Sequence, residues 1–148
     1  MQEPDRNPAL DRLEALVGDW TMEAGPPGGP AWPGEATVSF EWLDGRWFLI
    51  QRWKVEMPEA PDGIALIGLG ESDGTFQQHF FDSRGVHRIY EMTLDDGVWT
   101  LWRYHPGFSQ RYEGRVSEDG KAIEGRWEKQ LDSGHWEIDF DLTYTKVS

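Results

Sequence analysis

At four places in this chain an Asp-Gly dipeptide separates short segments in which apolar and polar residues alternate. These four dipeptides are Asp44-Gly45, Asp73-Gly74, Asp96-Gly97 and Asp119-Gly120. Asp-Gly between alternating segments is among the strongest short signals for a β-hairpin, because these residues readily adopt the positive φ angles of tight turns. Pro106-Gly107 and Ser133-Gly134 mark two more turns.

The alternation begins after Trp20 and predicts about ten strands. The expected strands are residues 19–24, 35–43, 46–57, 63–71, 75–82, 86–94, 98–105, 108–116, 121–130 and 135–145. No segment between them is long enough for a crossover helix, so the expected order is up-and-down and antiparallel. That many sequential hairpins require either a closed barrel or two sheets, and we expect an all-β, closed antiparallel barrel.

A short helix is expected before the strands. Asn7 can cap its N-terminus, Pro8 suits the first helical position, and Gly18 can end it. The apolar residues at helical spacing are Leu10, Leu13, Leu16 and Val17. We expect this helix to pack across one mouth of the barrel. The length of 148 residues fits one domain, residues 1–148, with one core.

Charge and composition exclude several classes of partner and site. The net charge of −13 disfavours nucleic acid and anionic membrane surfaces as partners. The chain has no Cys, which excludes disulfides and Cys-based metal sites. Residues 1–5 lack a basic, apolar leader, and no apolar run approaches the ~20 residues of a membrane helix. We therefore expect a cytoplasmic protein, and the sequence leaves a homodimer open.

Hairpin register predicts which side chains face the barrel interior. The expected inward residues of the last strand are Trp136, Ile138, Phe140, Leu142 and Tyr144. Carried through the turns, the same face includes Arg88, Tyr90, Arg103, Gln110, Tyr112, Trp127 and, near a strand end, His105. Residues 75–82 are ambiguous. A four-residue loop after them turns His79 inward, whereas a three-residue loop turns Gln78 and Phe80 inward, and we favour the first.

Arg88 and Arg103 are the most informative residues on this face, because no Asp or Glu accompanies them on the five C-terminal strands. A buried guanidinium is costly unless it is paired. The interior therefore either holds water around the arginines or receives an anion such as a carboxylate, which the guanidinium fork suits. Alternatively, the arginines reach solvent from strand ends, or a bulge turns Arg103 outward.

Residues 25–34, rich in Gly and Pro, cannot form a regular element. They are either an inert connector or a lid over the interior with Trp32 as its plug.

Several longer motifs resemble those of a known family. They are Gly18-Asp19-Trp20 after a short helix, residues 81–86, 99–103, 108–111 and 125–128, and Trp136-Glu137 through Tyr144. Together they resemble an uncharacterised bacterial family with a calycin-like (lipocalin-like) barrel, distantly similar to nitrobindins and fatty-acid-binding proteins. The resemblance implies a closed barrel and no established activity. Nitrobindins hold ferric haem through a His near the C-terminal strands, where His135 is the nearest candidate here, although it points outward. Fatty-acid-binding proteins hold a carboxylate with interior Arg and Tyr.

The sequence contains no HExxH, P-loop, GxGxxG or nucleophile-elbow motif, so no metal site is predicted and no group of residues favours an enzyme, which the sequence leaves open. We predict a barrel that binds a small amphipathic, anionic ligand. The predicted site is Arg88, Tyr90, Arg103, His105, Gln110, Tyr112, Trp127 and His79. The alternatives are haem binding of the nitrobindin type and an interaction domain whose core is filled by side chains.

Overall fold

The computed structural model describes residues 6–57, 59–131 and 134–147. Two predictions concern residues outside these ranges. One is the absence of a leader in residues 1–5, and the other is the turn at Ser133-Gly134, because Ser133 is not described. The elements are a 3-10 helix η1 (Pro8–Leu16) and the strands β1 (Gly18–Gly25), β2 (Ala36–Trp42), β3 (Leu49–Val55), β4 (Gly63–Leu69), β5 (Phe76–Asp82), β6 (His87–Asp95), β7 (Val98–Arg103), β8 (Ser109–Val116), β9 (Ala122–Gln130) and β10 (Trp136–Lys146).

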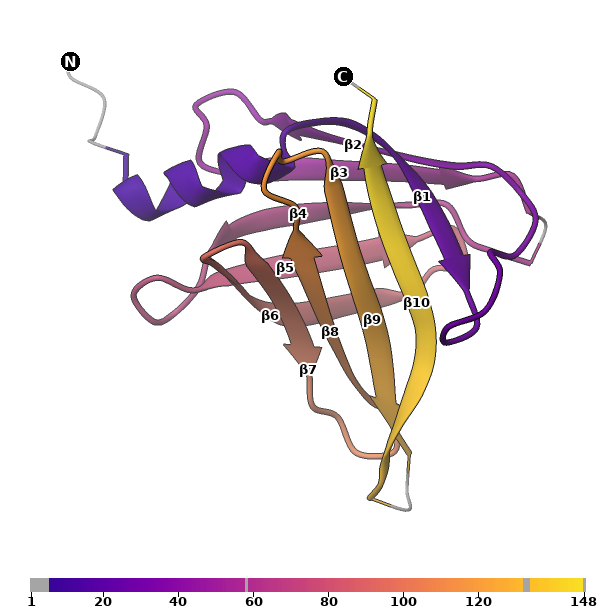
Figure 1. The fold of residues 1–148 in the computed structure, drawn as a ribbon. Coiled ribbons are helices and arrows are strands. Elements are labelled where there is room, and N and C mark those ends of the chain that lie inside the picture. Colours follow the sequence, from indigo (N-terminus) through magenta and orange to yellow (C-terminus); the bar gives the residue numbers. More distant parts are fainter. Residues whose placement is uncertain (1–5, 58, 132–133, 148) are drawn as a thin grey trace.

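The strands form a closed antiparallel barrel, which confirms the predicted fold class. Each strand pairs with its neighbours along the chain, and β10 pairs with β1 to close the sheet (Figure 1). The Asp96-Gly97 turn illustrates how the sequence achieves this. Asp95 and Val98 pair directly, and Asp96 and Gly97 between them have φ angles of 50° and 76°. This two-residue turn matches the twist of the flanking strands.

Helix η1 is present as predicted, wound as a 3-10 helix. The Asn7 side chain accepts a hydrogen bond from the Ala9 amide at 2.9 Å. Its apolar stripe, fully buried, is Leu10, Leu13 and Leu16. This spacing of three residues places all of them on one face of a helix with three residues per turn.

The helix lies across one end of the barrel (Figure 1). Arg12 forms an ion pair with Asp95 at the β6–β7 turn (2.7 Å), and the Trp42 indole donates to Glu14 (2.8 Å). Behind the helix leucines, a buried cluster fills this end of the barrel. It includes Trp20, Phe40, Phe76, Met92 and Leu94. No helix among the described residues is long and apolar enough to cross a membrane.

The structure corrects the predicted direction of β5. Phe81 pairs with His87, and the Asp82 amide donates to the Val86 carbonyl, so the loop contains three residues. Phe76 and Gln78 are therefore buried, and His79 faces outward, where its ring lies 6.3 Å from that of His87. The expectation that His79 points inward is wrong.

A β-bulge reverses the predicted side-chain direction at the start of β10. The register with β9 shifts between Ile138 and Phe140. Ile138 is consequently 45% exposed, and the Trp136 ring packs outside the barrel against the Arg111 guanidinium at 4.0 Å. Trp136 and Ile138 were expected to face inward, but the extra residue turns both of them out. Beyond the bulge, the inward direction of Phe140 is as predicted.

Candidate functional site

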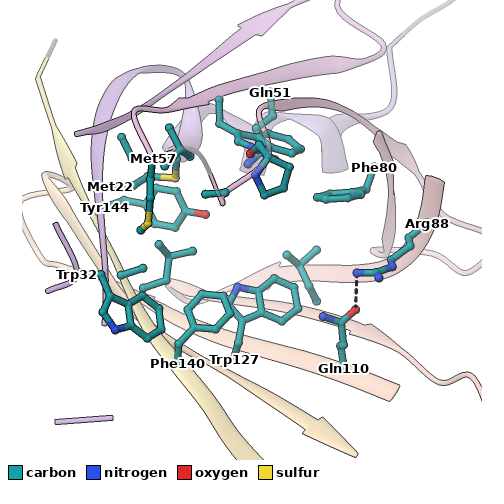
Figure 2. A pocket seen from close by; sticks show the side chains of 18 of the residues that line it. Met22, Trp32, Gln51, Met57, Phe80, Arg88, Gln110, Trp127, Phe140 and Tyr144 are labelled. Carbon is teal, nitrogen blue, oxygen red and sulfur yellow. Dashed lines mark hydrogen bonds between the residues drawn. The ribbon is translucent and has the colours of Figure 1, made fainter. Parts of the chain in front are cut away.

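A cavity of about 490 Å³ occupies the part of the barrel that the buried cluster leaves open. Its wall is mainly aromatic and aliphatic (Figure 2). The large apolar side chains of the wall include Met22, Trp32, Trp53, Phe80, Trp99, Leu101, Phe108, Trp127, Phe140 and Leu142. This volume and composition are typical of pockets for small molecules. The filled-core alternative required a lumen packed with side chains, and the cavity is inconsistent with it.

A polar cluster of Arg88, Gln110 and Tyr90 stands on one side of the cavity. The carbonyl oxygen of the Gln110 side chain accepts hydrogen bonds from Arg88 Nη1 at 3.3 Å and from the Tyr90 hydroxyl at 2.8 Å (Figure 2 marks the first). The Arg88 guanidinium also lies 5.4 Å from the centre of the Phe108 ring. Burial raises the pKa of Tyr90, and its hydrogen bond network with Arg88 opposes that effect. Tyr90 is therefore a neutral hydrogen-bond donor.

No carboxylate among the described residues forms an ion pair with Arg88. The other arginine of the cavity wall, Arg84, is paired with Asp82 at 2.7 Å. This pairing lowers the pKa of Asp82 against the opposing effect of its burial. Of the two arginines in the cavity wall, Arg84 therefore has an ion-pair partner among the described residues and Arg88 has none.

Two buried glutamines extend the polar wall. Gln51 and Gln78 are 6% and 4% exposed, and the Gln78 side-chain amide donates to Gln51 at 2.8 Å. Gln78 pairs directly with Tyr90 across β5 and β6. The sequence reasoning missed Gln78 as a site residue because it favoured the wrong loop length. The signal was Gly85, which has a φ of 84° and ends a three-residue hairpin loop of the kind that requires a left-handed residue.

The predicted site residues divide into two groups. Those that line the cavity are Arg88, Tyr90, Gln110 and Trp127. Arg103 and Tyr112 do not line it, although Arg103 donates to the Phe108 carbonyl at 3.2 Å, beside the wall. His105 lies beyond the end of β7 on an exposed turn, with Nδ1 at 3.0 Å from the Pro106 carbonyl. His79 is on the outer surface. The residues that the prediction omitted include Gln78, Phe80 and Tyr144.

Tyr112 lies beneath the cavity wall and has an unusual environment. It is 1% exposed, and its hydroxyl has no hydrogen-bond partner among the described residues. The hydroxyl lies against two facing glycines, so a Cβ atom on Gly125 would stand 2.2 Å from it and one on Gly114 would stand 2.6 Å away. Burial raises the pKa of Tyr112 well above its ordinary value.

The residues of the cavity do not fit nitrobindin-type haem. None of the four histidines of the chain is part of the cavity wall. Within the described ranges there is also no group of three potential metal ligands. A haem in this cavity would lack the axial His on which that alternative depends.

The Gly- and Pro-rich segment 25–34 lies at the cavity. Trp32 is part of the cavity wall and lies 6.1 Å from the Phe140 ring, although it is 45% exposed. The Gly28 amide donates to Asp141 at 2.8 Å, and Asp141 also accepts from Arg126 at 2.6 Å. Residues 32–34 of this segment thus form part of the cavity wall, as the lid alternative requires.

Two solved structures share the fold. The crystal structure of Rv2717c from M. tuberculosis matches with a TM-score of 0.70 and 15% sequence identity, over 97% of this chain and 100% of that one. A DUF3598-family protein from Nostoc punctiforme PCC 73102 matches with a TM-score of 0.61 and 13% identity, over 91% of this chain and 49% of that one. No protein-family model matches the chain, and no curated protein matches its sequence. At these identities the likeness is one of fold, an antiparallel barrel consistent with the calycin-like fold.

Proposed function

We propose that the barrel binds a small amphipathic molecule whose carboxylate is held by Arg88. The observation that carries the proposal is a guanidinium at the wall of a largely apolar cavity, with a neutral carboxamide as its side-chain partner. Partial removal from water makes an unpaired guanidinium costly, and a bound anion would offset that cost. The planar fork of Arg matches the two oxygens of a carboxylate.

Gln110 and Tyr90 are proposed to orient the arginine. Because the Gln110 oxygen accepts from both side chains, it holds one edge of the guanidinium and leaves its remaining donors for a ligand. The body of the ligand would lie against the aromatic rings of the wall. Trp53 and Phe80 stack at 5.1 Å, and Tyr90 and Trp127 meet edge to face at 5.7 Å. Such surfaces suit an aliphatic or aromatic body.

The test begins with native mass spectrometry of the purified protein, which detects small molecules that co-purify with it. Binding of decanoic acid and its methyl ester is then followed by fluorescence of the cavity tryptophans. We expect Arg88→Leu to weaken acid binding roughly 10- to 100-fold, as for the loss of about 1.5–3 kcal/mol from a charged hydrogen bond.

The matched control is Arg115→Leu, which removes the same charge from the outer surface, where the Arg115 side chain is 73% exposed. It should leave the affinity for the acid unchanged. Equal binding of acid and ester, or equal binding by wild type and Arg88→Leu, would refute the proposal.

A further inference from the structure

Tyr144, on β10, presents an unused hydroxyl to the cavity. The residue is 4% exposed and belongs to the cavity wall. Figure 2 shows its hydroxyl pointing into the cavity, on the side away from Arg88 and Gln110. It forms no hydrogen bond with any of the described residues. Because the hydroxyl faces the cavity, it is available to bond to a group that enters there.

The surroundings of Tyr144 indicate what kind of group this is. Figure 2 labels Met22 and Met57 next to Tyr144, with Trp32 farther along the same side of the cavity. The thioethers of the two methionines are weak acceptors. Among the described residues, the charged side chains of the wall are Arg84 and Arg88. Arg88 lies on the side opposite Tyr144, and Arg84 interacts electrostatically with Tyr90, which belongs to the Arg88 cluster (Figure 2). A second charged group beside Tyr144 would lack a counter-ion, which is costly in an apolar site. An uncharged oxygen is the chemistry that fits.

Burial also keeps the Tyr144 hydroxyl protonated, because desolvation raises its pKa above the ordinary value. The group can therefore donate to a carbonyl and can both donate to and accept from a hydroxyl.

We infer that the ligand carries, at the end remote from its carboxylate, an uncharged hydroxyl or carbonyl that hydrogen-bonds to the Tyr144 hydroxyl. This inference rests on the proposed function, which supplies the carboxylate end. Together the two contacts define the ligand class as hydroxy- or oxo-carboxylic acids with an apolar middle, and they fix the direction in which such a molecule lies.

The test compares octanoic, decanoic and dodecanoic acids with their ω-hydroxy derivatives, so that one pair matches the length of the cavity. For each pair we measure the ratio of the two dissociation constants by fluorescence titration. In Tyr144→Phe, the ratio at the matching length should shift roughly three- to tenfold against the hydroxy acid relative to wild type. Tyr112→Phe, which removes the same group outside the cavity, should leave the ratio unchanged.

The outcomes separate this inference from the proposed function. If the acids bind in an Arg88-dependent manner but Tyr144→Phe changes no ratio at any length, the inference is wrong and the proposed function stands. If none of the acids binds, or if binding is indifferent to Arg88→Leu, the proposed function fails and the inference fails with it.

Discussion

Removal of the Tyr112 hydroxyl should stabilise the protein, whereas the same change at Tyr90 should destabilise it. The Tyr112 hydroxyl is buried without a partner among the described residues, and a buried hydroxyl in this state costs about 1–3 kcal/mol. Phenylalanine keeps the ring contacts with Trp99 at 5.3 Å and Trp127 at 5.2 Å and loses only one atom. After the packing loss, we expect the free energy of unfolding to rise by about 1 kcal/mol.

Tyr90→Phe is the matched opposite. Its hydroxyl donates to Gln110 at 2.8 Å, so the change deletes a formed hydrogen bond and should cost about 0.5–1.5 kcal/mol. Urea denaturation of both variants measures the difference, with the slope m checked for constancy. Thermal unfolding should shift by roughly 2–4 °C for each kcal/mol in a chain of this size. A loss of stability in Tyr112→Phe as large as that in Tyr90→Phe would mean that the Tyr112 hydroxyl has a bonded partner, such as a buried water.

Three further predictions follow from the same structure. Gly125→Ala places a methyl group against the buried Tyr112 ring and should lower the free energy of unfolding by about 1–3 kcal/mol. Denaturant midpoints equal to wild type would contradict this. Burial raises the pKa of Tyr112 and Tyr144, so above about pH 10 the unfolded state loses protons that the folded state retains, and stability should fall as pH rises; denaturation curves from about pH 8 to pH 12 test the sign. Asp141→Asn weakens the anchor of residues 25–34 and should accelerate hydrogen exchange in that segment with little change in global stability; unchanged exchange there would rule out the anchor.

Much of the fold could be predicted because local signals agreed with the global structure. The Asp96-Gly97 turn encodes its hairpin in two residues, and the leucine stripe of η1 encodes its buried face. Period-two alternation then determined the inward direction of Arg88, Tyr90 and Gln110, since side chains alternate strictly along an undistorted strand.

The predicted side-chain directions were wrong where a strand contains one extra residue or a loop contains one residue fewer than expected. The sequence pattern does not reveal the bulge in β10. Ile138 and Phe140 are both apolar, so the alternation of apolar and polar residues continues unbroken through the point where the register shifts. The loop after β5 depended on whether Asp82 belongs to the strand. In the structure Asp82 pairs with Val86 and its side chain caps the turn through the Arg84 amide at 2.9 Å. A difference of one residue moved His79 outside and brought Gln78 into the cavity wall.

Pairing of β1 with β10 has a consequence for how the chain folds. The Thr21 hydroxyl donates a hydrogen bond to the carbonyl of Thr145, which lies 124 positions away in the sequence. The pairing of β1 with β10 closes the barrel and removes the last two free strand edges. During synthesis, the β1 edge must therefore wait unpaired until the final strand leaves the ribosome. Contacts of such long sequence separation slow folding to the millisecond-to-second range typical of β-barrels. The interval before closure is when a newly made chain is most exposed to pairing with the wrong strand, its own or a neighbour's.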